Sequence, residues 1–406
     1  MDTTTAQALI RFGLGRRPSE ALPSDPPGWL ARQLQGPDPA RLAGLPAIAD
    51  GLIAFREDRA QRRADPATPS QRKQQLFRAD ATAQLASAID TEAPFRERLV
   101  WLWFNHFTVS RRRHAVTATI GPFIREAIRP GVTGRFADLL LAVMRHPAML
   151  LYLDNARSVG PNSPAGQRQA RGVNENLARE CLELHTLSPA AGYTQADVAE
   201  FAKILTGWSI DLRADAPGFL FRPNAHEPGA KRLMGRDFQP GEEGGVQALA
   251  FLAHHPATYR HLATQLARHF VADEPPPDAV RRIEGVLHDT HGDLGAAALA
   301  VTRLPAAWHP LAKLRSPQDY GIACLRALDL PAANRPDLLQ ALNALGQPVW
   351  AAPLPNGWPD QAADWAASEA VLPTAWQRIS AGHHRVRRQS GRARHGYRNN
   401  DGRPNQ

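Results

Sequence analysis

The sequence predicts a mainly α-helical fold, a multi-helix globular domain with a short β-hairpin excursion. Apolar residues recur at the helical period through most of the first 370 residues, whereas the alternating pattern of half-buried strands is scarce. Hydrophobic residues make up 43% of the 406 residues, enough for a sizeable core. We expect one helical domain over 1–372, with 210–245 as the place where it would subdivide, and a separate segment over 373–406.

The expected elements follow from periodicity, caps and breakers. Thr194 with Asp197 resembles a capping box that starts a helix, and Gly207 resembles the stop of that helix. Pro256 is expected to break a long apolar segment into two helices. Residues 218–238 are the best candidate for the hairpin. The expected helices cover 94–109, 136–154, 174–187, 194–208, 245–271 and 294–304.

The C-terminal segment carries most of the positive charge. Residues 377–406 contain eight arginines and one acidic residue, Asp401, a net charge of +7 out of +9 for the chain. Few apolar residues occur there, so we expect disorder after about Pro373. Our hypothesis is an out-of-frame or truncated C-terminus. Nucleic-acid binding through this segment is disfavoured, because it lacks a set of aromatic stacking partners.

Composition also limits the class of protein. No apolar run approaches the roughly 18 residues of a membrane span, and no signal peptide is visible at the start, so we expect a cytoplasmic location. Cys181 and Cys324 are too few for a disulfide framework or a four-cysteine zinc site.

The stretch "NENLARECLELHTL", residues 174–187, is the densest group of chemically capable side chains. At 100° per residue its polar residues share one face, and His185 falls on the opposite, apolar face, which disfavours a Glu–His metal pair within the helix. Two interpretations remain: a solvated stripe with an i,i+4 ion pair, or a buried acidic cluster for acid–base or metal chemistry. The polar face comprises Glu175, Asn176, Arg179, Glu180, Glu183 and Thr186.

Two histidines outside this stretch are further candidates. His106 in "WLWFNHF" falls on the apolar side of its helix, where a hydrogen-bonded core residue is the common outcome and a general base or ligand the alternative, with Asn105 adjacent. His226, in the expected hairpin, has a turn role or a catalytic role. "RHF" at 268–270 and "KLRSPQDY" at 313–320 are interpreted as helix-edge and turn residues.

The same residues carry a family resemblance. The chain resembles the bacterial family called domain of unknown function 1800 over about residues 8 to 370. The motifs are "RFGLGRRP", "RERLVWLWFNHFTVS", "HPAMLLYLDN", "NENLARECLELHTLSPAAGYTQADVAEFAKILTGW", "FRPNAHEPGAKRLMG", "HPATYRHLATQLARHFVADEPP", "KLRSPQDY" and "PNGWPDQAADW". At His185 the family pattern also accepts phenylalanine.

The resemblance implies candidate residues but no reaction. Members are bacterial, often exported, and often encoded beside a sulfatase-like protein, which would be a candidate partner. On family positions, the catalytic candidates are Glu175, Arg179, Glu180, Glu183 and His106. The binding candidates are Asn105, Asn174, Asn176 and His226.

Two functions therefore stay open. The first is a module of an exported or envelope-associated system with no assignable reaction. The alternative is a metal-assisted or acid–base hydrolytic enzyme that uses the 175–183 helix with His106. The sequence identifies no metal and no cofactor.

Overall fold

A computed structural model describes residues 1–366, except 66–70, 170–171, 310–312, 332–334 and 336. The expectations for residues 373–406 lie outside the described residues. The described chain is mainly α-helical with two small antiparallel hairpins, which confirms the expected fold class. No described helix combines the length and the apolar character needed to cross a membrane.

The helices follow one another along the whole described chain. In the first half they are α1 (Thr3–Gln7), α2 (Pro26–Gln35), α3 (Ile48–Ala64), α4 (Gln71–Asp90), α5 (Pro94–His106), α6 (Ile120–Phe123), α7 (Arg129–Gly131), α8 (Phe136–Arg145), α9 (Pro147–Tyr152), α10 (Pro164–Gln169), α11 (Asn176–Glu180) and α12 (Gln195–Ile204). In the second half they are α13 (Glu242–Ala253), α14 (Pro256–Phe270), α15 (Pro277–Asp289), α16 (Leu294–Thr302), α17 (Pro317–Leu328), α18 (Leu338–Ala344) and α19 (Ala362–Ala366).

Local sequence signals place several helix ends. Thr194 and Asp197 form the expected capping box of α12, with the Thr194 side chain accepting from the Asp197 N–H at 3.2 Å. Pro256 starts α14 after the end of α13, so the expected break is confirmed. The expected helix 136–154 is divided between α8 and α9, because Pro147 cannot continue the ladder of α8.

The β structure differs from the single expected excursion. Strand β1 (Trp208–Asp211) pairs with β2 (Gly218–Phe221), and β3 (Lys231–Leu233) pairs with β4 (Arg236–Phe238). The expected helix 194–208 was therefore too long, because the chain turns at Gly207 with φ +84° and continues as β1.

The motif helix also departs from expectation. After α11 the chain continues as a π-helical turn over Cys181–His185, where a continuous α-helix was expected through 187. Because the helix ends there, the carbonyl groups of Leu184 and His185 have no partners within it, and both accept hydrogen bonds from imidazoles. Such single π turns are frequent at functional sites.

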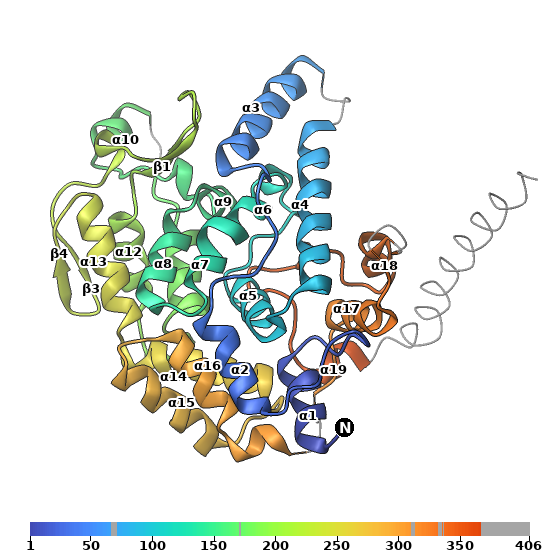
Figure 1. Cartoon of the computed structure of the whole chain (residues 1–406). Coiled ribbons are helices and arrows are strands. Elements are labelled where there is room, and N and C mark those ends of the chain that lie inside the picture. The colour runs from blue at the N-terminus through green and yellow to red at the C-terminus, as the bar shows by residue number, and fades with distance from the viewer. Residues whose placement is uncertain (66–70, 170–171, 310–312, 332–334, 336, 367–406) are drawn as a thin grey trace, which may run out of the picture.

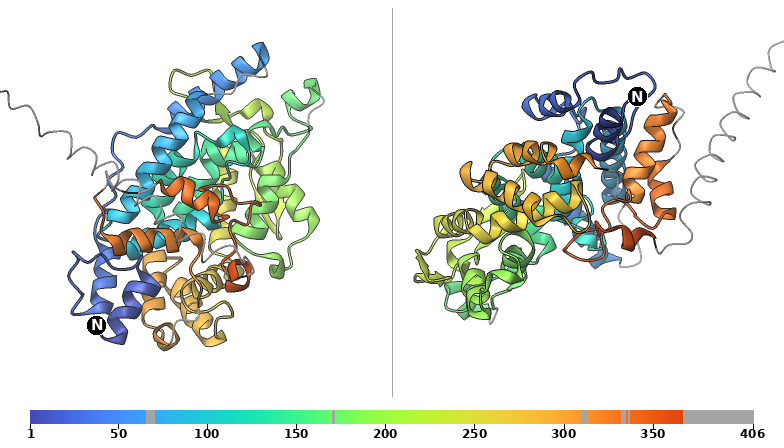
Figure 2. Two further views of the ribbon diagram at one scale, coloured as in Figure 1. Left: turned by 90° about the vertical axis from the view of Figure 1, so that its right-hand side faces the viewer. Right: turned by 90° about the horizontal axis from the view of Figure 1, so that it is seen from below.

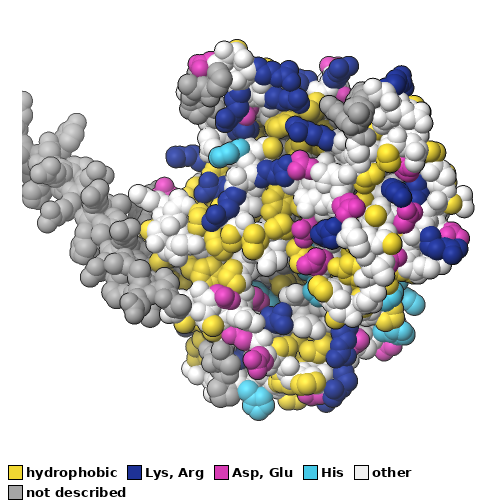
Figure 3. All heavy atoms as spheres, turned by 180° about the vertical axis from the view of Figure 1, so that it is seen from behind, with side chains coloured by type: hydrophobic (Ala, Val, Ile, Leu, Met, Phe, Trp, Pro, Cys, Tyr) yellow, Lys and Arg dark blue, Asp and Glu magenta, His cyan; other side chains and the backbone are white. Residues whose placement is uncertain are grey.

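Helix α5 occupies the centre of the fold (Figure 1). Its residues Phe95, Leu99 and Trp103 are buried in the main hydrophobic core. Helices α14 to α16 pack together below it, α4 rises beside it, and the segment after α18 runs back across the molecule near α5 (Figures 1 and 2). On the face in Figure 3, Lys and Arg side chains gather toward the upper edge.

Candidate ligand-binding site

The first part of the motif helix has the geometry of a solvated stripe. The Arg179 Nη2 atom lies 2.8 Å from Glu175 Oε2, and both side chains are more than one-third exposed. Gln195 also donates to Glu175, at 2.9 Å. This i,i+4 pair is the expected ion pair, and it is worth only a few tenths of a kcal/mol.

The next two carboxylates lie in a more enclosed place. Glu180 and Glu183 are partly buried, and burial, with the neighbouring Glu183, raises the pKa of Glu180 above its usual value. Burial and the charge of Glu180 raise the pKa of Tyr152 to about 12. Burial and Glu183 also raise the pKa of Tyr193. The structure therefore brings the two glutamates together with two tyrosines.

His106 approaches the motif helix from the opposite, buried side. Its Nε2 donates to the His185 carbonyl at 3.1 Å, and His261 Nε2 donates to the Leu184 carbonyl at 3.0 Å. Because a carbonyl only accepts, both imidazoles carry a proton on Nε2. Burial, and then the neighbouring histidines, hold the pKa of His106 well below its usual value. Its contacts are therefore with the helix end and not with the carboxylate face.

His185 completes this group of rings. It is 1% exposed, neither ring nitrogen has a hydrogen-bond partner in the described part of the chain, and burial, with His261 nearby, lowers its pKa to about 3. The ring centroids of His106 and His185 are 5.9 Å apart, and those of His106 and His261 are 5.8 Å apart. Within the described residues, no group of three or more His, Cys, Asp or Glu side chains has the arrangement of a metal site.

Two of the binding candidates hold local backbone. The Asn174 side chain accepts from the Asn176 N–H at 2.9 Å, which helps to start α11. His226 is buried, with Nδ1 donating to the Thr206 carbonyl at 2.8 Å and Nε2 accepting from the Gly241 N–H at 2.9 Å. Both ring nitrogens of His226 are thus engaged, in the turn role that the sequence allowed.

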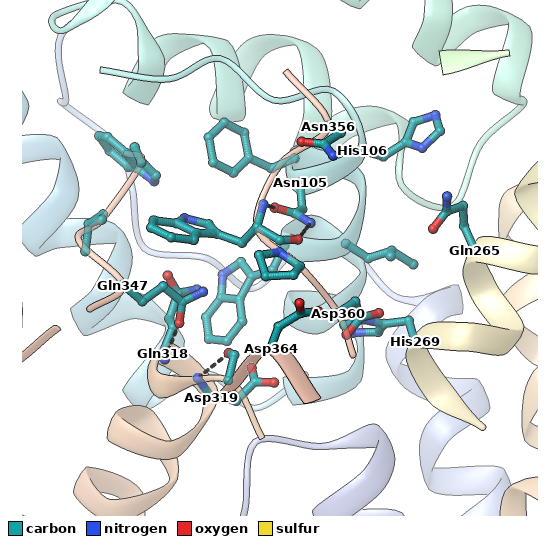
Figure 4. A pocket seen from close by; sticks show the side chains of 18 of the residues that line it. Asn105, His106, Gln265, His269, Gln318, Asp319, Gln347, Asn356, Asp360 and Asp364 are labelled. Carbon is teal, nitrogen blue, oxygen red and sulfur yellow. Dashed lines mark hydrogen bonds and ion pairs between the residues drawn. The ribbon is translucent and has the colours of Figure 1, made fainter. Parts of the chain in front are cut away.

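Asn105 is engaged with a segment far along the chain. Its Oδ1 accepts from the Trp358 N–H at 2.8 Å, and its Nδ2 donates to the Trp358 carbonyl at 2.9 Å. These two bonds fix the "PNGWPD" loop, residues 355–360, against the end of α5. The loop and α5 form adjoining walls of an open cavity of about 410 Å³ (Figure 4).

Aromatic and amide side chains line this cavity. Trp101 and Phe104 come from α5, and Trp350 and Trp358 come from the C-terminal segment. The amides that line it are Gln84, Asn105, Gln265, Gln318, Gln347, Asn356 and Gln361, and five of them are labelled in Figure 4.

A charged chain of residues forms one side of the cavity. His269 Nδ1 lies 2.9 Å from Asp360 Oδ2, and His269 Nε2 lies 3.1 Å from Arg98 Nη2. The same Nη2 atom of Arg98 lies 3.5 Å from Oδ2 of Asp319. Lys313 donates to the Asp360 carbonyl and lies 3.5 Å from its Oδ1. Four separate chain segments thus meet at His269.

The hydrogen bonds fix the state of this histidine. An arginine cannot accept, so Nε2 of His269 offers its lone pair to Arg98 while Nδ1 carries the proton toward Asp360. Burial alone would raise the pKa of Asp360, but His269 and Lys313 more than offset this and hold it at about 2. Asp360 therefore stays ionised and orients the imidazole, an arrangement suited to general-base chemistry.

Sequence reasoning missed His269 and Asp360 as functional candidates. Both lie in stretches with the family resemblance, "RHF" and "PNGWPDQAADW", and "RHF" was interpreted only as a helix edge. The signal available was the presence of titratable residues within the family motifs. Their pairing across 91 residues could not be read from spacing.

Fold and cavity define a mainly α protein with an open cavity, lined by polar and aromatic side chains, beside α5. Residues 7–381 match the model of a family described as "Protein of unknown function (DUF1800)", nearly the whole chain, and the chain belongs to this family. The chain matches no curated protein and no solved structure.

Proposed function

We propose that the cavity between α5, α14 and residues 349–364 binds a polyhydroxylated, sugar-like ligand. The observation that carries this proposal is the combination of four aromatic side chains with seven side-chain amides around one open space of about 410 Å³. The C–H faces of a sugar ring pack against aromatic faces, while amides both donate to and accept from hydroxyl groups. The volume falls within the range of small-molecule sites.

The charge of the lining supports a ligand that is largely neutral in this space. Arg268 is accompanied by Asp319, Asp360 and Asp364 on the walls, so anionic groups are not favoured in the main cavity. The aromatic walls are placed by backbone bonds, including those from Asn105 to Trp358. Such positioning lowers the entropy cost of binding.

Titration calorimetry tests this proposal with hexasaccharides of neutral sugars and of uronic acids. At least one of them should bind the full-length protein, and Trp358→Ala should weaken binding at least tenfold. Trp29→Ala, at a partly buried tryptophan on α2 outside this cavity, should leave binding unchanged. Absence of binding by every sugar, or equal binding by Trp358→Ala, would overturn the proposal.

General-base catalysis on that ligand is the second candidate function, favoured by the Asp360–His269 pair. A water molecule that displaces Arg98 from Nε2 of His269 would pass a proton to that nitrogen while its oxygen bonds to the anomeric carbon, and the glycosidic oxygen would leave and take up a proton from solvent. Arg98 would remain paired with Asp319, which lies 3.5 Å away in the free protein. In this candidate, Asp360 acts as a positioning residue for the imidazole.

Product analysis separates a binding module from an enzyme. Sugars that bind would be incubated with wild type and His269→Gln, and release of new reducing ends would be measured. Loss of turnover with retained binding in His269→Gln supports catalysis. Binding without turnover in the wild type supports the module of an exported or envelope-associated system, and rejects hydrolytic catalysis on that ligand.

The hydrolytic site on Glu175, Arg179, Glu180 and Glu183 stays a prediction, as do the sulfatase-like partner and the cellular location. Glu180 and Glu183 share an enclosed environment with Tyr152, which supports acid–base chemistry at that place. His106 would not take part directly, because its ring is bonded to the opposite side of the helix.

A further inference from the structure

A second, small cavity adjoins the main one. Its volume is about 40 Å³, and four residues line both cavities: His269, Ser316, Asp319 and Asp360. The His269–Asp360 pair therefore lies between the main cavity, which is rich in aromatic and amide groups, and a small cavity whose lining is mostly charged.

Four cationic side chains surround the small cavity. They are Arg11, Arg98, Lys313 and Arg315, against the two carboxylates of the shared wall. Lys313 forms an ion pair with Asp273, which does not line the cavity, with Nζ 2.5 Å from Oδ1. Even with that carboxylate included, the formal charge around the cavity is positive, opposite in sign to that of the main cavity's walls.

Two of these arginines lack full compensation. The Nε–H of Arg98 is buried and has no hydrogen-bond partner among the described residues. Arg315 is partly buried and donates to the Ile10 carbonyl at 3.1 Å, but it forms no ion pair within the described part of the chain, and burial lowers its pKa. A buried donor without a partner and a partly buried cation without a paired carboxylate each cost free energy. A bound anion would remove both costs.

The size of the cavity limits that anion. Its volume of about 40 Å³ is roughly a tenth of that of the main cavity, which favours a small anionic group. A carboxylate has three heavy atoms, whereas phosphate and sulfate have five. The guanidinium fork of arginine matches a carboxylate in two parallel hydrogen bonds.

We propose that the small cavity receives a carboxylate group, and that the sugar bound in the main cavity is a uronic acid. This inference rests on the proposed sugar binding, and assigns the substrate class of that same site. The sugar ring lies in the larger space, and its carboxylate passes the His269–Asp360 wall to reach Arg98 and Arg315.

Methyl esters provide probes of the charge, because esterification replaces the carboxylate by an uncharged group that is one methyl larger. Hexamers of galacturonate, mannuronate and glucuronate would be titrated into the full chain beside their methyl esters. At least one free acid should bind ten or more times tighter than its ester. In Arg315→Gln that ratio should fall to near one, with the affinity for the ester unchanged.

Two controls keep the test sharp. Arg260→Gln removes a largely exposed arginine paired with Glu284 and should leave the ratio as in wild type. If Arg315→Gln fails to fold, Arg315→Lys takes its place. This variant keeps the positive charge but loses the planar guanidinium group, so its ratio of acid to ester affinity should lie between that of wild type and one. Formate alone, compared with chloride at equal ionic strength, should raise the melting temperature of wild type more than that of Arg315→Lys.

The outcomes separate the two proposals. Sugars that bind equally well as acids and esters would overturn the carboxylate site and leave sugar binding intact. Protection by formate that depends on Arg315, without binding of any sugar, would overturn sugar binding and keep the carboxylate site. Protection by phosphate or sulfate but not by formate would overturn the assignment to a carboxylate.

Discussion

The side-chain amide of Asn105 hydrogen-bonds both the N–H and the carbonyl of Trp358, 253 residues away along the chain. One residue at the end of α5 thus holds the backbone of the loop that carries Trp358 and Asp360. Through this loop the aromatic wall and the carboxylate partner of His269 are placed together. Asn105 acts on the site by positioning the loop.

Substitution of Asn105 by alanine should therefore destabilise both the fold and the site. Two hydrogen bonds are lost and two backbone groups are left unsatisfied, so we expect about 1–3 kcal/mol less free energy of unfolding. Urea unfolding measures this loss. Asn356→Ala, at an exposed amide of the same loop, should change it by less than about 0.5 kcal/mol. Equal losses in the two variants would contradict the positioning role.

Gly357 is needed for the same contact. Its φ is +83°, and a Cβ atom there would lie 2.6 Å from the Asn105 carbonyl oxygen. Gly346 has a nearly equal φ of +80°, but a Cβ atom there would meet no atom of the described residues within 4 Å. Gly357→Ala and Gly346→Ala should both lose about 1 kcal/mol to the left-handed backbone, and only Gly357→Ala should lose about 1–3 kcal/mol more. Thermal unfolding of the pair isolates the contact.

His185 should make the protein sensitive to acid. Its folded pKa of about 3 lies below the usual 6.5, so the unfolded chain binds the proton first as the pH falls. Its contribution to the free energy of unfolding is fully present above pH 6.5. Below that pH the contribution falls by about 1.4 kcal/mol per pH unit. We expect wild type to lose about 2 kcal/mol between pH 7 and 5 from this residue.

Replacement of His185 by phenylalanine should flatten that slope, whatever constant packing cost it adds. Urea unfolding at several pH values provides the measurement. His288→Gln, at a side chain that is 73% exposed, should keep the wild-type slope. An unchanged slope in His185→Phe would show that other groups control acid sensitivity.

Glu180 should respond to pH in the opposite sense. Its pKa is raised by burial and by Glu183, so the folded state binds a proton more readily than the unfolded state near and above the usual pKa. The carboxylate is therefore unfavourable at pH 7, and the penalty disappears as the pH falls through the raised pKa.

Glu180→Gln should accordingly be more stable than wild type at pH 7, by less than about 1 kcal/mol, with the difference vanishing near pH 4. Glu175→Ala should instead lose a few tenths of a kcal/mol at pH 7, because its ion pair with Arg179 is lost. Chemical denaturation at the two pH values distinguishes them. A loss of stability in Glu180→Gln at pH 7 would contradict the assigned environment.

Much of the local structure could be predicted from the residues. Thr194 and Asp197 started α12 as expected, Pro256 started α14, and the inward placement of His185 followed from helical periodicity. The prediction of the hairpins was less accurate, because Gly207 was compatible both with the end of a helix and with a turn into a strand. The π turn at Cys181–His185 left no mark in the periodicity.

The sequence by itself determined the helical class, the family and the polarity of each helix face. Periodicity and capping depend on residues that are close together in the sequence, so they can be predicted from it. Only the tertiary structure decided that Asn105 meets Trp358 and that His269 meets Asp360. A helix face encodes that it will be buried but not against which distant segment, since that choice depends on the packing of the whole core.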